Sequence, residues 1–503
     1  MTALRQTIIF IMNILTKSQM QAGVTLVSDR TFSYSIEPEI PASYMGSLLD
    51  FVFQKYIRPH ERQFSDVSRA EVDGLPALRF VVLDESRARK VDVTVKGSKP
   101  LELKIVLLSE KATEETADQA RQDILIVSEM FEEKVRESTL FFAWREGEKI
   151  VPEKISGRER KPLNRIFLET QVFLFVIFIT LGVFVYFLLG PYTPIVLLAF
   201  QFVFVIFSPK IIERTADWRI TKEDPTIHMV EYSLPIEEHD SFRQKYPPEK
   251  IAEIKKQVYQ ETIAKNGEID CETTGQIFRK FGFECSPENL SAKKVNVYEL
   301  VKKVADKFHF KVPKIIVTNT LIPNAAAAGP SPSRGVVLIT TGAMIQLEEN
   351  ELLSVLGHEF GHLKGRDPFW LYALSAVQYL LWFYVIFGFF PTSSFLLVII
   401  YFWVLSTITY FIAKFFEARA DLTSAIVMGQ PNILANALEE IGFKRLLVER
   451  IPSYRIQEWI SFDPHPPIYF RVNRLRKFKE GTKIEHPLIQ SAKEVTRGFL
   501  DSL

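Results

Sequence analysis

Two histidines and one glutamate in the second half of the chain have the types and spacing of metal ligands and a catalytic base. They form the segment His358-Glu359-Phe360-Gly361-His362, an HExxH motif. Residues four apart lie on one face of an α-helix, so both imidazoles can bind one metal ion, and Zn²⁺ is the usual occupant. Glu359 projects about 100° away from His358 and can act as a base without binding the metal.

The surrounding residues favour this interpretation over a chance match. With only 8 histidines among 503 residues, a chance HExxH is expected in roughly one such sequence in a hundred. Leu352, Leu356 and Phe360 form an apolar stripe at helical spacing, and the acidic Glu348 and Glu349 suit a helix N-terminus. A buried helix with two hydrogen-bonded histidines is the plain alternative.

Two histidines do not complete a zinc site, because a catalytic zinc takes a third protein ligand and keeps one position open. Glu417 is the best candidate, since two apolar segments within residues 368–413 form a hairpin that returns the chain to the face it left. Asp421, four residues further on, falls on the same helical face and can hold the second nitrogen of a ligand histidine. Taken alone, the spacing of Glu417 and Asp421 would equally suit a solvent-exposed helix face.

These motifs together resemble the HtpX-type membrane zinc peptidases, which are gluzincins related to the type I CAAX prenyl proteases. The resemblance covers roughly residues 295–476 and leaves residues 1–160 and 223–291 without a counterpart. It includes Pro323-Asn324-Ala325, similar to the family's substrate-edge segment, and His465-Pro466-Pro467 followed by an arginine. The resemblance implies a zinc-binding role for His358, His362 and Glu417, a base in Glu359, an oxyanion-stabilising role for His465, and substrate binding or ordering of the site for Asn324 and Arg471.

An alternative stays open for His465, which the two following prolines would also order as a simple loop histidine. The rival functions differ in kind. A site-2-type intramembrane protease is disfavoured because charged Lys364, Arg366 and Asp367 closely follow the motif. A non-enzymatic membrane scaffold with a structural zinc would not need Glu359, whereas a CAAX prenyl-protein protease would.

Four apolar segments predict a multi-pass protein of the cell membrane. They cover residues 166–189, 195–207, 368–390 and 395–413. The second is short, so a re-entrant or interfacial pair is the alternative to the first hairpin. Basic residues flank both hairpins, whereas the connections near 190–194 and 388–394 carry no charge, which predicts that all soluble domains are cytoplasmic.

The whole pattern predicts an α+β multidomain membrane protein, with four transmembrane helices and a mainly helical gluzincin peptidase domain that contains a small β-hairpin or sheet. In the N-terminal part, alternating patterns predict strands near 31–36, 77–82, 90–95, 101–108 and 139–144, and helices near 44–56 and 113–135. The expected domains are a soluble α+β domain (1–160), a transmembrane hairpin (161–210), a cytoplasmic helical region (211–300), the edge strand and HExxH helix (301–367), a second transmembrane hairpin (368–413), and the third zinc ligand with C-terminal helices (414–503).

Composition limits the partners. The net charge of +1 provides no basic surface, so nucleic acid is not expected to bind. Cys271 and Cys285 match no metal spacing and no disulfide framework, which predicts a reducing compartment for the soluble parts. Residues 1–160 carry no catalytic constellation, so a regulatory partner is the default expectation for them.

The sequence thus predicts a zinc-dependent endopeptidase, embedded in the bilayer, that hydrolyses unfolded or membrane proteins at the cytoplasmic face in protein quality control. Residues 314–318 and 335–341 have strand patterns and are expected to pair as a hairpin. An extended peptide substrate is expected to bind as an added strand along 335–341, close to the metal helix. The alternative is that this strand lies inside a sheet and only supports the fold.

Overall fold

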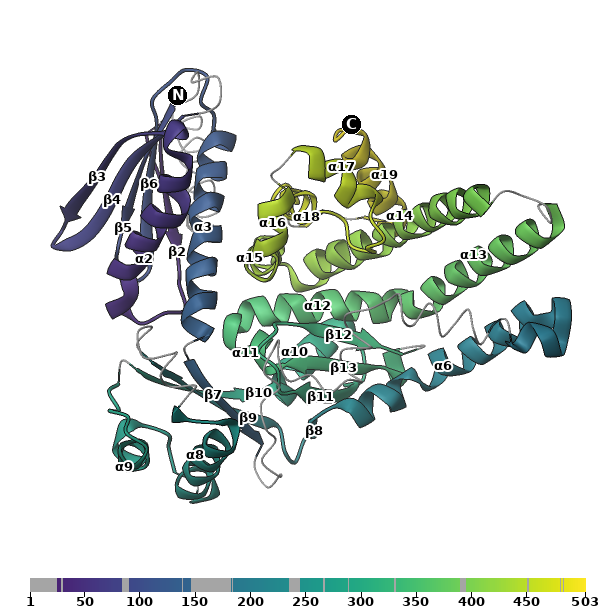
Figure 1. Cartoon of the computed structure of the whole chain (residues 1–503), viewed down its shortest axis with the longest axis horizontal. Helices are drawn as coiled ribbons and strands as arrows, with labels where there is room; N and C mark the ends of the chain where they lie inside the picture. The colour runs from purple at the N-terminus through teal and green to yellow at the C-terminus, as the bar shows by residue number, and fades with distance from the viewer. Residues whose placement is uncertain are drawn as a thin grey trace, which may run out of the picture. The chain divides into compact units, whose positions relative to one another are not determined.

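The structure is a computed structural model that describes residues 25–83, 90–145, 182, 184–234, 245–329, 332–389, 395–449 and 452–503, apart from residues 29, 138, 266, 288, 480 and 483. The described residues form two compact units, each of which is described by itself (Figure 1). The first unit takes in Met1–Leu140, Glu231–Ile251 and Asp270–Ser291, and the second takes in Phe141–Val230, Ala252–Ile269 and Ala292–Leu503.

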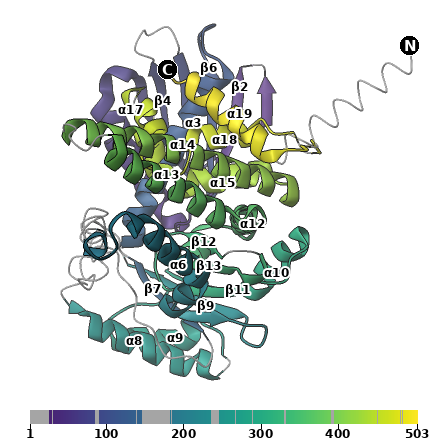
Figure 2. The ribbon, with the colours of Figure 1, turned by 90° about the vertical axis from the view of Figure 1, so that its right-hand side faces the viewer.

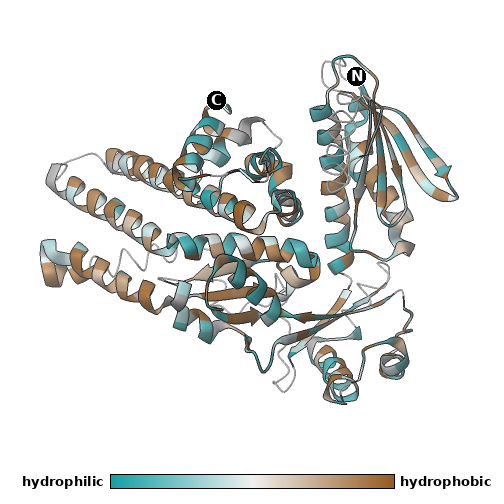
Figure 3. Cartoon of the chain, turned by 180° about the vertical axis from the view of Figure 1, so that it is seen from behind, coloured by the Kyte–Doolittle hydropathy of each residue, from teal (hydrophilic) through white to brown (hydrophobic). Residues whose placement is uncertain are grey.

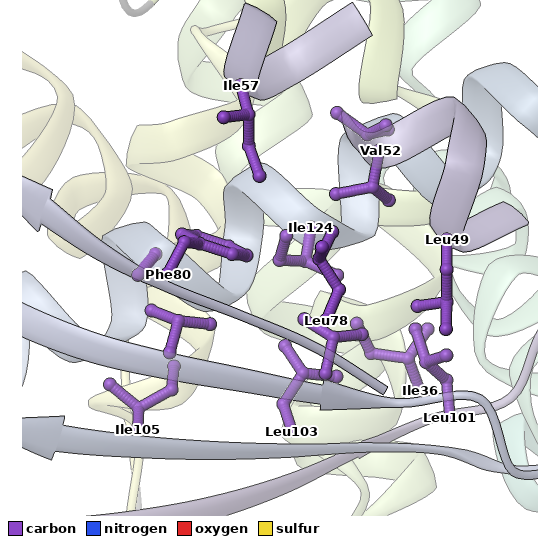
Figure 4. Close-up of a cluster of buried hydrophobic side chains, with 14 of the residues drawn as sticks. Ile36, Leu49, Val52, Ile57, Leu78, Phe80, Leu101, Leu103, Ile105 and Ile124 are labelled. Carbon is purple, nitrogen blue, oxygen red and sulfur yellow. The ribbon is translucent and has the colours of Figure 1, made fainter. Parts of the chain in front are cut away.

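A six-stranded antiparallel sheet with the order β1-β2-β6-β5-β4-β3 carries the first unit. Buried apolar residues and more exposed polar residues alternate along its strands, so that one face of the sheet is apolar and buried while the other is polar. Two helices cover the apolar face, and Figure 4 shows Leu49, Val52 and Ile124 of these helices above Leu103 and Ile105 of β6. The elements are β1 (Thr25–Ser28), β2 (Thr31–Ile36), α2 (Met45–Val52), β3 (Phe64–Val72), β4 (Leu75–Leu83), β5 (Lys90–Lys96), β6 (Leu101–Leu107) and α3 (Glu114–Glu137).

The strands and helices predicted between residues 31 and 135 are confirmed within a few residues. The strand predicted near 139–144 also exists, as β7 (Thr139–Arg145), but it belongs to a separate three-stranded sheet with the order β10-β9-β7. Strands therefore occur within residues 211–300, which were expected to form a helical region, beside the helices predicted there. The elements are β8 (Trp218–Ile220), β9 (Thr226–Ser233), α8 (Pro248–Glu261), α9 (Cys271–Lys280) and β10 (Leu290–Asn296).

The two cysteines form a disulfide, so the expectation that they stay unpaired was wrong. Cys271 begins α9 and Cys285 lies in the loop that follows this helix, with their Cα atoms 5.5 Å apart. Their separation of 14 residues has no local signature in the sequence, because the turn after α9 is what brings the chain back. The cysteines therefore give no support to a reducing compartment.

A four-stranded sheet with the order β12-β13-β11-β8 lies in the second unit. The hairpin expected between the strands at 314–318 and 335–341 was wrong, because β11 (Lys314–Thr318) and β13 (Val336–Thr340) run parallel. The connection between them contains β12 (Ala325–Ala328), which pairs antiparallel with the outer side of β13. Four successive alanines have little strand propensity, so the sequence pattern did not reveal this element.

The HExxH segment lies on α12 (Glu349–Gly365), as predicted. At the C-terminal end, Arg366 adopts a left-handed conformation that ends the helix, and α13 (Asp367–Phe389) begins at the next residue. The chain returns through α14 (Phe395–Met428), which packs closely on α12. A Cβ on Gly361 would stand 3.0 Å from the Cα and the carbonyl oxygen of Ala420, so the absence of a side chain there permits this approach.

Among the described residues, two helical stretches are long and apolar enough to cross a membrane, namely Phe184–Phe207 and Ile399–Met428. The first includes part of α6 (Thr193–Thr215), which packs on α13, where the Tyr372 hydroxyl donates to the Leu198 carbonyl at 2.8 Å. Large apolar side chains on these helices are exposed, among them Phe187 at 83% and Trp370 at 52%. Figure 3 shows the apolar residues along the three long helices labelled α6, α13 and α14 in Figure 1.

These exposed apolar helices support a membrane protein of mixed helix-and-sheet class. The predicted segment at 166–189 lies mostly outside the described residues. Those at 195–207, 368–390 and 395–413 fall on α6, α13 and the start of α14. Four complete spans and their orientation remain predictions.

The C-terminal helices pack around the second half of α14. Helix α19 lies along α14, as Figure 2 shows. The remaining helices of this unit are α10 (Val297–Phe308), α11 (Thr341–Gln346), α15 (Pro431–Ile441), α16 (Phe443–Glu449), α17 (Pro452–Ile460), α18 (Ile468–Arg476) and α19 (Pro487–Leu500).

The N-terminus of α12 allows a test of stability against pH. The Glu351 carboxylate accepts a hydrogen bond from the Glu348 amide at 3.1 Å, and burial raises the pKa of Glu351 from 4.5 to about 7. The folded state therefore binds this proton more tightly than the unfolded state, so stability is lost as the pH rises from 4.5 to about 7.

Glu351→Gln keeps the cap acceptor and removes the titration. We expect this variant to exceed the wild-type free energy of unfolding at pH 8 by about 1–2 kcal/mol, and to lose that advantage at pH 5. Thermal unfolding in detergent at both values checks the expectation. A difference between the two proteins that is the same at pH 5 and pH 8 would contradict it.

Candidate metal centre

Three predicted ligands meet at one point between α12 and α14. His358 and His362, one turn apart on α12, place their Nε2 atoms 3.0 Å from each other. Glu417 of α14 presents one carboxylate oxygen to each ring. Its Oε2 lies 3.5 Å from Nε2 of His358, and its Oε1 lies 3.5 Å from Nε2 of His362. All three ligand atoms lie within 4.8 Å of one another.

This arrangement fits a tetrahedral zinc ion. Ligand atoms about 2.0–2.1 Å from a tetrahedral zinc lie roughly 3.3 Å from each other. The two imidazole nitrogens are 3.0 Å apart, and each lies 3.5 Å from a different carboxylate oxygen of Glu417, which is close to that value. Glu417 Oε2 is buried and accepts no hydrogen bond from the described residues. A buried carboxylate oxygen of this kind needs a positive partner, which a zinc ion provides.

A carboxylate lies beside the outward nitrogen of each of these imidazoles. His358 Nδ1 is 2.9 Å from Asp421 Oδ1, as the helical spacing predicted. His362 Nδ1 is 2.7 Å from Asp367 Oδ2, a residue that the sequence reasoning did not assign to the site. The left-handed turn at Arg366 directs the start of α13 back toward His362. Helical spacing within one helix does not predict such a turn, so it could not indicate Asp367.

An arginine holds each of these aspartates. Arg471 of α18 donates two hydrogen bonds to Asp421, at 2.8 and 2.7 Å, and Arg419 donates to Asp367. Burial alone would lower the pKa of Arg471, but the Asp421 carboxylate holds it above its usual value. Because Arg471 is only 6% exposed, this geometry favours the ordering role over the predicted substrate contact.

Glu359 is on the same helix but faces the sheet. Its Oε2 accepts a hydrogen bond from the Ala327 amide of β12 at 2.8 Å. Burial raises the pKa of Glu359, although the neighbouring histidines and this hydrogen bond act in the opposite direction. A carboxylate with a raised pKa binds a proton more tightly, which suits a general base. The predicted base therefore lies between the ligands and a strand at the edge of the sheet.

That strand is β12, whereas the sequence had predicted an edge strand at 335–341. This prediction was wrong, because β13 lies between β12 and β11. Asn324 accepts a hydrogen bond from the Thr340 amide at 3.0 Å, so Asn324 and, by alternation, Ala326 face β13. Ala325 and Ala327 consequently direct their amide and carbonyl groups to the open edge, as the bond from Ala327 to Glu359 illustrates.

The remaining predicted site residues also lie in this region. Asn324 immediately precedes β12, and its side chain is exposed. His465 lies in the loop before α18, with Nε2 at 3.5 Å from Glu417 Oε2 and Nδ1 at 2.7 Å from Asp463 Oδ1. Burial opposes ionisation of Asp463, but the hydrogen bonds from His465 hold the pKa of Asp463 below its usual range. Asp463 was also missed, and its place two residues before His465 is the only signal in the sequence.

Comparisons with known proteins agree with this geometry. Residues 291–479 match Peptidase family M48. The chain is similar to Protease HtpX homolog 2 of Methanosarcina acetivorans, with 33% identity over 31% of this chain and 57% of the relative. It is also similar to a Protease HtpX homolog of Pyrococcus furiosus, with 30% identity over 36% of this chain and 72% of the relative.

Among solved structures, Ste24p of S. mikatae matches 35% of this chain and 49% of its own, at 18% identity. The TM-score of 0.28 is too low to assign a fold from it. The chain thus spans 57% of the M. acetivorans relative, and residues before 291 lie outside the matched family region.

The pairing of Asp367 with His362 predicts a specific effect on metal affinity. Asp367→Asn keeps the size of the side chain but removes the charge that orients the imidazole. We expect zinc affinity to fall by about 10–100-fold, because carboxylates behind ligand histidines have effects of this size. Competition against a chelator of known affinity measures the change.

Lys364→Gln is the matched control, since Lys364 is an exposed residue one turn before Asp367. It should bind zinc as the wild type does. Wild-type affinity in Asp367→Asn would show that His362 does not depend on this aspartate.

Proposed function

Because the chain belongs to peptidase family M48, we propose that it is a membrane-embedded zinc endopeptidase that cleaves extended segments of unfolded or membrane proteins at the cytoplasmic face. One observation carries the proposal. His358, His362 and Glu417 converge beside Glu359, which is hydrogen-bonded to the edge strand β12. Ligands, base and a place for a peptide backbone are thereby adjacent.

Zinc, when bound by these three residues, supplies a Lewis acid that polarises the scissile carbonyl and makes water more acidic. Glu359 takes the proton of the attacking water and passes it to the leaving amine. His465 lies beside Glu417, where its Nε2 can donate a hydrogen bond to the carbonyl oxygen of the scissile peptide bond as negative charge develops on that oxygen. Such a donor typically contributes about 10²–10³ in rate.

The open edge of β12 accounts for the proposed substrates. Main-chain groups of Ala325 and the Ala327 carbonyl can pair with any extended peptide, whatever its side chains. Asn324 is proposed to add a side-chain hydrogen bond to the peptide backbone near the zinc. Because this mode requires an extended chain, unfolded segments should be cut and compact domains spared.

The exposed apolar helices support action at a membrane surface, since such a surface would be costly in water. Basic residues such as Lys210, Arg214 and Lys364 flank the apolar segments, which supports a cytoplasmic peptidase domain. A regulatory partner is proposed for the N-terminal sheet, whose strand β3 is largely exposed at the edge.

Prenylated CAAX proteins are the alternative substrates, and cleavage of a farnesylated CAAX peptide in preference to unfolded casein would favour them.

Glu359→Gln tests the mechanism. The variant keeps the three ligands and loses the base, so it should bind zinc normally while cleavage of unfolded casein falls by about a thousandfold. Metal content and cleavage should be measured on the same preparation. Cleavage at the wild-type rate would exclude Glu359 as the base, and a protein that binds zinc without any proteolysis in the wild type would favour a scaffold.

Two neighbouring proline substitutions test the edge strand. Ala325→Pro removes an amide that faces the open edge, whereas Ala326→Pro removes one that faces β13. Ala325→Pro should keep its thermal stability and lose about tenfold in kcat/KM for an unfolded substrate, which corresponds to one main-chain hydrogen bond.

Ala326→Pro is the matched control for damage to the sheet, and it should lower the unfolding temperature. If Ala325→Pro is stable and cleaves at the wild-type kcat/KM, then substrates do not pair with β12.

A further inference from the structure

Within the described part of the chain, Asp463 provides the hydrogen-bond contacts that hold His465. The Asp463 carboxylate oxygen Oδ1 accepts a hydrogen bond from the His465 amide at 2.8 Å and lies 2.7 Å from His465 Nδ1. Both contacts use the same oxygen, so the backbone and the ring of His465 are fixed together. The ring nitrogen that remains, Nε2, faces Glu417 Oε2 at 3.5 Å.

This restraint matters because His465 is otherwise open to solvent. Its side chain is 43% exposed, whereas those of the ligand histidines His358 and His362 are 9% and 13% exposed. Packing alone does not prevent a half-exposed ring on a loop from rotating into water. A donor that rotates away from the substrate carbonyl loses most of its catalytic effect.

Asp463 is itself fixed from two sides. Arg445 of α16 donates to Asp463 Oδ2 at 2.9 Å, which leaves Oδ1 for His465. Lys414 of α14 donates from its ammonium group to the main-chain carbonyl of Asp463. Lys414 is fully buried and lies three residues before Glu417, so the loop is attached to the helix that carries the third ligand.

We propose that Asp463 is a positioning residue for peptide hydrolysis, which holds His465 with Nε2 directed at the scissile carbonyl, and that Lys414 and Arg445 fix Asp463 in this role. The inference rests on the proposed function, and it extends it from His465 to the groups that make His465 effective. Asp463 acts through His465 and touches neither substrate nor zinc.

The test compares Asp463→Ala, Asp463→Asn, His465→Ala and the double variant Asp463→Ala/His465→Ala in the full-length protein. Zinc content, kcat and KM on an unfolded fluorogenic peptide are measured for each. Two inhibitors serve as probes. A phosphinic peptide places its phosphinyl oxygen at the position of the oxyanion, whereas a zinc-binding hydroxamate serves as the comparison for metal binding.

Asp463→Ala should retain zinc and KM within about twofold, while kcat falls by about 10–100-fold, toward the value of His465→Ala. The double variant should be no slower than His465→Ala, because both changes remove one function. Asp463→Asn keeps an acceptor for His465 and should recover part of kcat. Phosphinate affinity should fall with kcat, whereas hydroxamate affinity should stay unchanged.

Glu458→Gln is the matched control. Glu458 and Asp463 both accept a hydrogen bond from Arg445, at 2.8 and 2.9 Å, but only Asp463 of these two carboxylates lies against the His465 ring. This variant should keep the wild-type kcat, which separates loss of an Arg445 ion pair from loss of His465 orientation.

Two results would overturn the inference while the wild type still cleaves. One is a wild-type kcat in Asp463→Ala, and the other is a double variant whose loss equals the product of the two single losses. Loss of zinc in both Asp463 variants would assign the residue a structural role instead. If the wild-type protein binds zinc and cleaves no peptide, the proposed function fails rather than the positioning role alone.

Discussion

The site depends on aspartates that fix imidazoles through the nitrogen facing away from the centre. A neutral imidazole can turn about its side-chain bonds and can carry its proton on either nitrogen. An aspartate at one nitrogen sets both properties and leaves the other nitrogen for the metal or the substrate. Three such pairs occur, namely His358 with Asp421, His362 with Asp367, and His465 with Asp463.

Each of these aspartates brings a second requirement. A buried carboxylate, such as that of Asp421 or Asp367, costs several kcal/mol unless a positive group compensates it, and one imidazole does not provide a permanent charge. Asp463 is less buried, since 35% of its side chain is exposed. Each aspartate accordingly accepts a hydrogen bond from an arginine on another helix, so every imidazole depends on a second element of the fold. The three arginines are Arg471 of α18, Arg419 of α14 and Arg445 of α16.

The sequence revealed the groups whose spacing follows helical periodicity and missed those that depend on turns. His358, His362, Glu417 and Asp421 lie on two helices, and each pair is four residues apart, so their convergence was predictable. Asp367 faces His362 only because the chain reverses at Arg366. The edge strand, the parallel pairing of β11 with β13 and the disulfide likewise depend on long connections that leave no periodic pattern.

Helix α14 joins the metal site to the apolar hairpin. Lys414, Glu417 and Asp421 are three and four residues apart on one face, and each reaches a different element: the His465 loop, the two histidines, and Arg471. The same helix begins in the apolar segment at Phe395, while the partner helix α13 begins at Asp367. Both helices of the hairpin therefore position ligands, one through Glu417 and the other through Asp367. The α13–α14 hairpin thus contributes to the candidate site as well as to the apolar surface, because one of its helices supplies Glu417 and the other supplies the aspartate that faces His362.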